Sequence, residues 1–254
     1  MQTVIEINPA FQPAVSREDI LAVADNFDGV GELIFSGRNR LRRVTVGGAD
    51  VVVKRYKRFN AVRKVTRRFR PSKARRAYHN ALLLIELGIK TPAPLAYVEK
   101  RNAWGALTDS YFICAYAPMQ PLKSVMHDRR AIESFANFTA RLHNLGIIHG
   151  DLNRSNVVFT PVADGAELPQ EIDWQLIDIN RMHFRDSLTL TERRANTLLF
   201  SEPDEVYETF ARAYLRASGL PDTLLPSFIR AKILRDRRRT LFRAIKHPLR
   251  TLRP

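Results

Sequence analysis

Short apolar runs separated by turn residues fill the first half of the chain, and this pattern predicts a β-rich region. The runs "GELIFSG" and "RRVTV" indicate strands, and Gly47 and Gly48 then turn the chain into "ADVVVKRY", a hairpin strand with Lys54 at its end. Ser16 followed by Asp19 resembles a capping box, which predicts a helix over "ILAVADNF". The spacing of "SKARRAYHNALLLIELG" predicts a second helix, and "TPAPLAYVEK" and "DSYFICAY" indicate two more strands.

The second half of the chain has a different pattern. After an extended linker, "APMQP", helical spacing appears in "RRAIESFANFTARLHNLG" and "EVYETFARAYLRASG", with the strand-like runs "SNVVFT" and "DWQLIDI" between them. We therefore predict an α+β fold of two lobes with a cleft between them. Residues 1–116 would form a β-rich N-lobe and residues 117–254 a mostly helical C-lobe.

Composition narrows the class of protein. The chain has 254 residues, of which 45% are hydrophobic, so it can bury a real core. Its 41 Lys and Arg against 26 Asp and Glu give a net charge of +15, which favours an anionic partner. The single cysteine, Cys114, excludes a disulfide framework and a cysteine-based zinc site. The start of the chain lacks a secretion signal and no apolar run approaches the roughly 18 residues of a membrane span, so we expect a soluble cytoplasmic protein.

A polar loop lies between two apolar runs in "IIHGDLNRSNVVF" and carries Asp151 and Asn156. Phosphoryl transfer needs oxygen ligands for Mg²⁺, a carboxylate near the incoming hydroxyl and a cation on the phosphates. The loop offers an acid and an amide, "LIDIN" offers the acid Asp178, and "VVVK" offers Lys54. This set favours a phosphotransferase. The alternative is that Asp151 and Asn156 merely cap a turn, since both residue types bond their own backbone.

Other residues compete for these roles. Asp173, in "EIDW", comes at the start of the predicted strand, whereas Asp178 comes at its end, so we prefer Asp178 as the metal ligand. Lys57 competes with Lys54, but Lys54 directly ends the apolar run "VVV". His143 is interpreted as an ordinary helix residue.

The order Lys, Asp, Asn, Asp resembles the protein-kinase-like superfamily, whose catalytic loop has Asp and Asn at this spacing. More narrowly, the chain is similar to bacterial lipopolysaccharide core kinases, which phosphorylate Kdo or heptose sugars. The similarity covers about residues 1–215, and it is carried by "FSGRNRL", "VVVKRYKR", "SKARRAYHNALLLIELGIKTPAPLAYVE", "IIHGDLNRSNVVF" and "LIDINRMHF". It implies a bilobal protein-kinase-like fold, ATP and Mg²⁺ as cofactors, and a lipid A-linked core sugar as substrate.

The resemblance also implies a role for each residue. Asp151 would be the catalytic base or would orient the sugar hydroxyl, and Asn156 would bind magnesium. Asp178 would bridge Mg²⁺ to the β- and γ-phosphates, and Lys54 would hold the α- and β-phosphates. His149 would brace the loop.

The connector "FICAYA" would bind adenine through the Ala115 carbonyl and the Ala117 amide, with Cys114 bordering the adenine pocket.

Three departures from the family pattern stand out. First, "FSGRNRL" offers only Gly37 where protein kinases have several glycines, so Arg38 and Arg40 would contact phosphate in place of backbone amides.

The second departure is in the helix "ARRAYHNALLLIELG", which should present a glutamate to Lys54. The aligned position holds His79, so either Glu86, two turns later, substitutes or Lys54 is steadied differently. The third is Gly150, which stands where regulated protein kinases have an arginine that pairs with a phosphorylated activation loop. We expect a constitutively competent enzyme with a non-peptide acceptor.

Positive charge is concentrated in residues 54–76 and again from Arg230 onward. For a lipid-linked substrate, both segments would contact the anionic inner membrane, with the tail's apolar residues dipping into the interface. The alternative for the tail is a helix packed on the C-lobe with a solvated basic face. Nucleic acid is disfavoured because the basic runs lack interleaved aromatic residues. The apolar tail residues are Leu241, Phe242, Ile245, Leu249 and Leu252.

Three rival functions remain open. One is a phosphotransferase for aminoglycosides or choline, which fits a chain of +15 poorly because these substrates are cationic. Another is an atypical protein kinase that works on ribosome precursors. The last is a pseudokinase scaffold that binds lipid or RNA, which the missing helix glutamate favours and the intact Lys54, Asp151, Asn156 and Asp178 disfavour.

Overall fold

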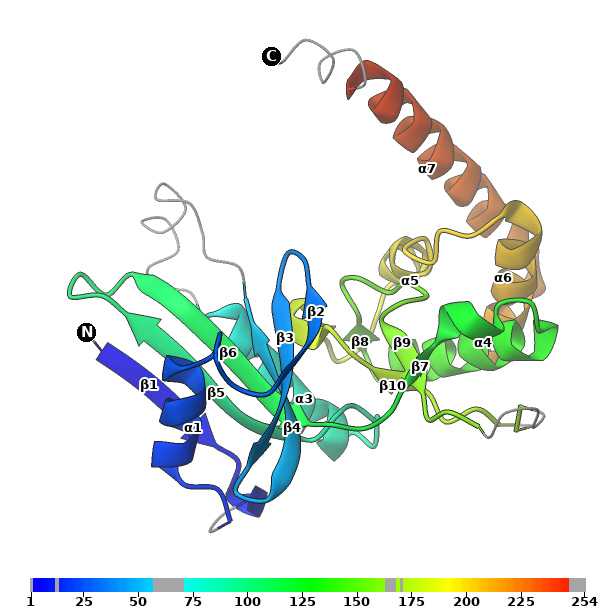
Figure 1. Cartoon of the computed structure of the whole chain (residues 1–254). Helices are drawn as coiled ribbons and strands as arrows, with labels where there is room; N and C mark the ends of the chain where they lie inside the picture. Colours follow the sequence, from blue (N-terminus) through cyan, green and yellow to red (C-terminus); the bar gives the residue numbers. More distant parts are fainter. Residues whose placement is uncertain (1, 12–13, 57–70, 163–167, 170, 247–254) are drawn as a thin grey trace. The chain divides into compact units, whose positions relative to one another are not determined.

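The chain forms two compact units in the computed structural model (Figure 1). Unit 1 comprises Met1–Met119 and Gln175–Arg181, and unit 2 comprises Gln120–Trp174 and Met182–Pro254. A sheet dominates unit 1 and helices dominate unit 2, in agreement with the predicted mixed class. The structure describes all residues except 1, 12–13, 57–70, 163–167, 170 and 247–254, and it describes no side chains for 243–246.

Unit 1 is built on a six-stranded sheet in the order β1-β5-β6-β4-β3-β2, in which every neighbouring pair is antiparallel. The predicted hairpin is present, and both of its glycines have a positive φ, 55° at Gly47 and 78° at Gly48. The strands are β1 (Gln2–Ile7), β2 (Glu32–Ser36), β3 (Arg40–Val46), β4 (Ala49–Arg55), β5 (Pro94–Arg101) and β6 (Leu107–Ala115).

Alternation along β4 separates the core of unit 1 from its polar face. Val51 and Val53 are fully buried in a cluster with residues of α1 (Arg17–Asp25), the helix whose predicted capping box of Ser16 and Asp19 is confirmed. Because successive strand residues point to opposite faces, Lys54 projects from the other side of the sheet.

Helix α3 (Lys73–Glu86) packs against β5 and β6. Its N-cap is Ser72, whose side chain accepts a hydrogen bond from the Arg75 amide, and it ends just before Gly88, where the predicted stop lies at φ 69°. A short turn, η1 (Pro9–Phe11), precedes α1. Strand β1, which the sequence pattern did not predict, pairs with β5 along its whole length.

A short segment far along the chain returns to unit 1. The Thr91 hydroxyl donates to the Leu176 carbonyl at 2.8 Å, and the Asn80 side chain of α3 donates to the Ile179 carbonyl at 2.7 Å. These bonds fix the backbone on both sides of Asp178. The segment contains β10 (Gln175–Leu176) and the turn η3 (Ile179–Arg181).

Unit 2 is a cluster of helices with an aromatic core. Phe135, Phe200 and Phe210 pack with ring centroids 4.9–5.2 Å apart, and Trp174 packs edge-on against Phe135. The helices are α4 (Arg129–Asn144), α5 (Leu190–Thr197), α6 (Asp204–Ser218) and α7 (Leu225–Lys246). The short elements are β7 (Gln120–Pro121), η2 (Leu122–Val125), β8 (Ile147–Ile148), β9 (Val157–Phe159), β11 (His183–Phe184) and η4 (Asp222–Leu224).

Antiparallel pairs of β7 with β9 and of β8 with β11 frame the polar loop of unit 2. The basic segment from Arg230 to Lys246 is the C-terminal part of α7, the last element in Figure 1. Among the helical residues that the structure describes, no helix is both long and apolar enough to cross a membrane.

Candidate functional site

The loop that carries Asp151 is held by its own amides. The Asn156 side-chain nitrogen donates to the Asp151 carbonyl at 2.9 Å, and the Asn153 side-chain nitrogen donates to the Asp151 carboxylate at 3.1 Å. Because the side-chain nitrogen of Asn156 donates this bond, its side-chain oxygen is the atom that a metal would bind. Asp151 and Asn156 are both half-buried, so both residues are partly open to solvent.

His149 braces this loop. Its ring is fully buried, and its Nδ1 accepts a hydrogen bond from the Asp151 amide at 3.1 Å. The His149 carbonyl accepts a bond from the Asn196 side chain of α5 at 2.8 Å. The backbone before Asp151 is therefore tied both to a ring and to a neighbouring helix.

A second histidine continues the network into the core of unit 2. The His143 Nε2 lies 2.9 Å from the Asn196 Oδ1, and its Nδ1 lies 2.8 Å from the Tyr214 hydroxyl. Since the Asn196 nitrogen donates to His149, its oxygen must accept from Nε2–H, and Nδ1 then accepts from Tyr214. Burial lowers the pKa of His143 to about 4, so the ring is neutral.

In unit 1 the predicted lysine and acid meet. The Lys54 Nζ lies 2.6 Å from the Asp178 Oδ1, with the side chains 14% and 30% exposed. The Asn180 side-chain nitrogen donates to the same Oδ1 at 2.8 Å. Among the described non-glycine residues only Asp178 has a positive φ, 55°, a conformation that aspartate tolerates better than most residues and that often marks functional sites. The competing acid, Asp173, is exposed and belongs to unit 2.

More cations gather around this pair than the sequence analysis identified. The ammonium groups of Lys54 and Lys73 lie over the Tyr56 ring, at 5.2 and 5.8 Å from its centroid. Burial, followed by repulsion from Arg181 and Arg38, lowers the pKa of Lys73. Lys73 therefore shares one electropositive region with Lys54 and with the tip of the β2–β3 hairpin. The sequence signal was its place in the first turn of α3, where a cation is unusual.

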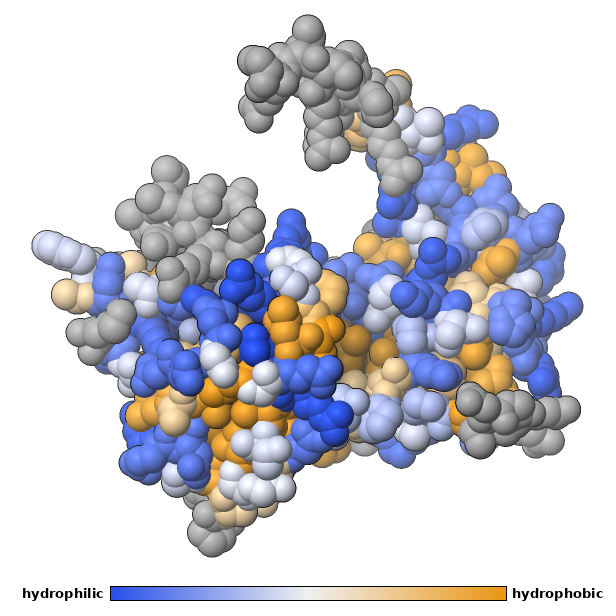
Figure 2. All heavy atoms as spheres, viewed as in Figure 1, coloured by the Kyte–Doolittle hydropathy of each residue, from blue (hydrophilic) through white to orange (hydrophobic). Residues whose placement is uncertain are grey.

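Gly37 and Arg38 form the tip of the β2–β3 hairpin, and both are exposed. A side chain at Gly37 would meet the Phe35 ring at 2.9 Å, so glycine lets that ring fold back over the turn. Arg40, the other expected phosphate contact, pairs with Asp28 at 2.9 Å. Phe35 is 54% exposed on β2, and apolar surface is visible over this part of the sheet (Figure 2).

In α3, the position where the family pattern places a glutamate is His79. His79 lies 3.6 Å from Glu6 of β1. Glu86 ends α3 with an exposed side chain, and within the described part of unit 1 it forms no ion pair with Lys54. Of the two alternatives left open by the sequence, the geometry favours the one in which Lys54 is steadied differently, by Asp178.

The predicted adenine contacts lie in the connector that follows β6. The Ala115 amide donates to the Ala93 carbonyl and the Tyr116 amide to the Asp50 carbonyl, whereas Ala117 is exposed beyond the last strand pair. Burial raises the pKa of Cys114 to about 12, so its thiol stays protonated. The adenine contacts of Ala115 and Ala117 stay predictions.

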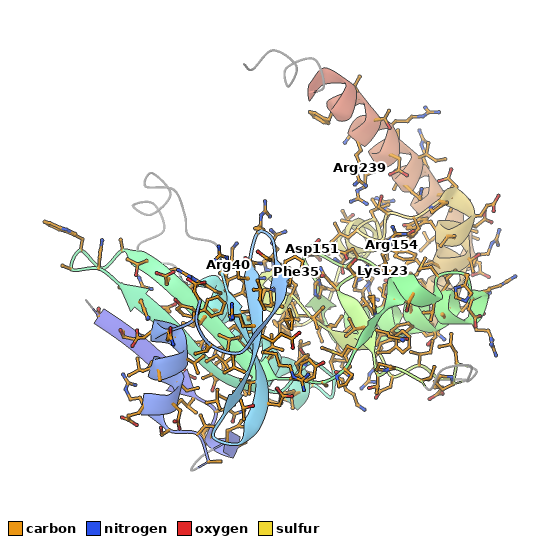
Figure 3. The ribbon with its side chains drawn as sticks, in the orientation of Figure 1. Phe35, Arg40, Lys123, Asp151, Arg154 and Arg239 are labelled. Carbon is orange, nitrogen blue, oxygen red and sulfur yellow. The ribbon has the colours of Figure 1, made fainter. Side chains whose placement is uncertain are left out.

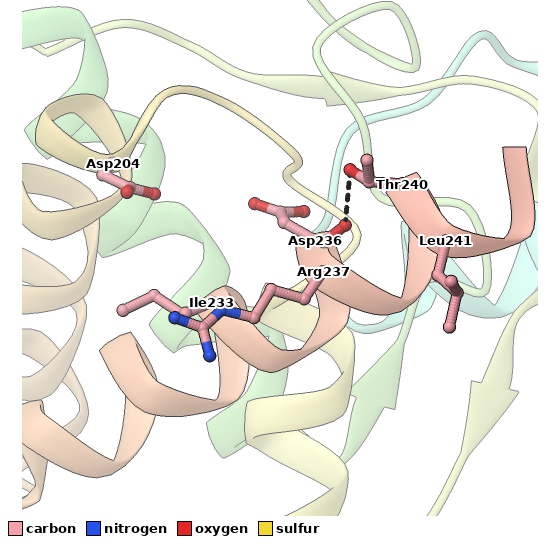
Figure 4. A pocket seen from close by; sticks show the side chains of 6 residues that line it. All are labelled: Asp204, Ile233, Asp236, Arg237, Thr240 and Leu241. Atoms are coloured by element: carbon pink, nitrogen blue, oxygen red, sulfur yellow. Dashed lines mark hydrogen bonds between the residues drawn. The ribbon is translucent and has the colours of Figure 1, made fainter. Parts of the chain in front are cut away.

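Several predicted residues lie outside the described chain or side chains. They are Lys57 and the rest of the basic stretch 57–70, the side chain of Ile245, and Leu249 and Leu252. A hollow beside α7 contains none of the predicted site residues (Figure 4). Within the described ranges no three His, Cys, Asp or Glu side chains cluster as a metal site. The hollow is lined by Asp204, Ile233, Asp236, Arg237, Thr240 and Leu241.

Comparison with known proteins gives one family and one fold. A sequence model of the lipopolysaccharide kinase (Kdo/WaaP) family matches residues 30–206. No curated protein sequence matches the chain. The solved structure "WaaP in complex with acyl carrier protein" superposes with a TM-score of 0.60 at 19% identity, over 91% of this chain and 98% of that chain. At this identity the superposition shows a shared fold.

Proposed function

This chain belongs to the lipopolysaccharide kinase (Kdo/WaaP) family, and we propose that it transfers the γ-phosphate of ATP to a hydroxyl of a Kdo or heptose sugar in the lipopolysaccharide inner core. Membership makes the chain a phosphotransferase that acts on a sugar hydroxyl. The observation that carries the proposal is the return of segment 175–181 to unit 1, which brings the Asp178 carboxylate to 2.6 Å from the Lys54 ammonium.

Unit 1 would hold the nucleotide. Lys54 would bind the α- and β-phosphates, and Asp178 would bind Mg²⁺. The groups around Asp178 suit this ion, because carboxylate and amide oxygens are its preferred protein ligands. The Asn180 Oδ1 next to Asp178 is buried and has no hydrogen-bond partner, so an unused oxygen acceptor is present. When bound, Mg²⁺ would neutralise charge on the transferring phosphate.

The cations around the ion pair would take the place of a glycine-rich loop. Arg38 at the hairpin tip and Lys73 at the start of α3 would bind phosphate oxygens by charge-assisted hydrogen bonds, with Gly37 allowing the tight turn between β2 and β3. Burial and then repulsion from Arg181 and Arg38 lower the pKa of Lys73, and a polyanionic ligand would relieve this repulsion. Ala115 and Ala117 would bind adenine at the end of β6.

Unit 2 would activate the acceptor. Asp151 would orient the sugar hydroxyl and accept its proton as the bond to phosphorus forms. Asn156 would add an oxygen ligand to the metal, since its nitrogen is already committed to the Asp151 carbonyl. The bond to His149 would hold Asp151 in position to accept the hydroxyl proton, which would lower the entropic cost of reaction.

The enzyme would work at the cytoplasmic face of the inner membrane, where α7 supplies a suitable surface. Arg230, Leu234, Arg237 and Leu241 follow one another at helical spacing and are all exposed, Leu234 at 47% and Leu241 at 62%. Polar and apolar surface alternate on this helix (Figure 2). Arginines beside exposed leucines attract anionic headgroups while the leucines enter the interface.

The proposal is tested by incubating the purified protein with Mg-ATP and either a Kdo-bearing lipid A precursor or the same glycolipid extended by heptose. Mass spectrometry is expected to show one added phosphate on one of the two, and chelation of the metal to prevent it. A protein that binds Mg-ATP and phosphorylates neither glycolipid would be a pseudokinase and would contradict the proposal.

A further inference from the structure

A second group of cations stands in unit 2, close to Asp151. Arg154 belongs to the same loop, three residues after Asp151, and its carbonyl accepts a hydrogen bond from the Lys123 amide at 3.0 Å. Lys123 and Arg154 are both exposed. The segment after β7 and the Asp151 loop therefore place two cationic side chains on neighbouring stretches of backbone.

A third cation reaches the same place from α7. The Arg239 guanidinium donates to the Ser201 hydroxyl at 2.8 Å, and the Arg154 guanidinium pairs with Glu202 at 3.0 Å. Because Ser201 and Glu202 are consecutive, the two guanidinium groups bind adjacent residues of the segment between α5 and α6. Figure 3 shows both arginines with Lys123 and Asp151 in this part of unit 2.

The Arg154 guanidinium is bound on one side by a nearly buried acid and is open to solvent on the other. The Glu202 side chain is only 9% exposed, whereas that of Arg154 is 52% exposed, so the acid holds one edge of the guanidinium and leaves its other donors to solvent. Two further acids, Asp204 and Asp236, pair with buried Lys232 at 2.6 and 2.7 Å, so this ammonium neutralises one of the two carboxylates.

We propose that Lys123, Arg154 and Arg239 form an acceptor subsite that binds an anionic group of the sugar substrate beside the hydroxyl that Asp151 activates. The inference rests on the proposed function and deepens it. Planar guanidinium groups suit carboxylate and phosphate, and three cations offset the repulsion between an anionic acceptor and the Asp151 carboxylate. Helix α7 is then part of the active site.

The anion has two possible sources on a core glycolipid, a sugar carboxylate or a phosphate. We would measure kinetics with the water-soluble deacylated oligosaccharide of a Kdo-bearing lipid A precursor. One sample has free carboxyl groups, one has them methyl-esterified, and one has its phosphates removed enzymatically. The wild-type protein should show a raised KM for the sample that lacks the recognised group, which identifies the source.

Arg154→Gln and Arg239→Gln should each raise the KM for the intact oligosaccharide about tenfold to a hundredfold, the effect of one charge-assisted hydrogen bond. The KM for ATP should stay unchanged. Arg239→Lys, which keeps the charge, should retain most of the affinity. The matched control is Arg212→Gln, an exposed arginine of α6 paired with Glu208, which should behave as wild type.

The decisive readout is the dependence on acceptor charge, which a purely structural role would not alter. On the neutralised acceptor, the KM of Arg154→Gln and of Arg239→Gln should equal that of the wild-type protein. An unchanged KM in both variants, or an equal loss on charged and neutralised acceptors, would overturn the subsite while leaving the proposed function intact. No transfer by the wild-type protein to any acceptor would overturn both.

Discussion

At the scale of single residues, the site combines expected and unexpected groups. Lys54 and Asp178 were predictable because each ends an apolar run, a pattern that places a charged side chain at the edge of a buried strand. Lys73 and Asn180 were not, because their importance comes from what the fold puts beside them. The left-handed backbone of Asp178 was equally hidden, since aspartate tolerates this conformation but does not require it.

Lys73 provides the sharpest prediction at this scale. Lys73→Met should raise the KM for ATP about tenfold or more, because the phosphates lose one cation of the cluster over Tyr56. Lys73→Arg should recover most of that affinity. Arg75→Met removes an exposed cation from the same helix and serves as control. A wild-type KM for ATP in Lys73→Met would exclude Lys73 from the phosphate site.

At the scale of elements, most helices and strands followed from periodicity, and the exceptions share a cause. The core helices α4 and α6 carry clear apolar stripes and were predicted, whereas β1 depends on pairing with β5 about ninety residues later and α5 is a short polar helix. His143 was interpreted as an ordinary helix residue. Its function appears only when Asn196 and Tyr214, on two other helices, are brought to it.

Burial of neutral His143 predicts a dependence of stability on pH. The folded state takes up a proton only near pH 4, whereas the unfolded state does so near pH 6.5, so protonation favours unfolding between these values. Protonation of His143 alone should lower the free energy of unfolding by about 3 kcal/mol as the pH falls from about 6.5 to about 4. Urea unfolding at a series of pH values measures it.

The variant His143→Gln isolates this contribution. Its free energy of unfolding should be lower than that of wild type at pH 7, and the gap should shrink towards pH 4. His127→Gln, an exposed histidine of the same unit, should follow the wild-type curve. Parallel curves for wild type and His143→Gln would show that His143 is not the titrating group.

For the molecule as a whole, the change from strand-like to helical spacing of apolar residues was enough to predict a sheet-rich part followed by a helical part. It was not enough to assign the segment Gln175–Arg181, which belongs with unit 1 although the chain on either side belongs with unit 2. Sequence distance alone does not reveal such a return. The net charge of +15 was informative about partners and silent about fold.

Charge and exposed apolar groups together predict binding to anionic bilayers. The protein should sediment with vesicles containing phosphatidylglycerol and not with pure phosphatidylcholine, and added salt should weaken the binding. Changing both Leu241 and Phe242, 62% and 63% exposed, to Ser should weaken it by about a hundredfold or more if both side chains enter the bilayer. Trp104→Ser, which removes a 78% exposed ring from unit 1, is the control. Equal binding by all three proteins would exclude α7 as the contact.

The most direct test of the whole account is single-turnover transfer of the γ-phosphate from Mg-ATP to the Kdo-bearing glycolipid, by wild type and by Asp151→Asn. We predict transfer by wild type and a rate about 10²- to 10⁴-fold lower in the variant, with Mg-ATP binding unchanged, because only the proposed acceptor of the hydroxyl proton is lost. Asp173→Asn, an exposed acid outside the loop, should match wild type. An undiminished rate in Asp151→Asn would contradict the account.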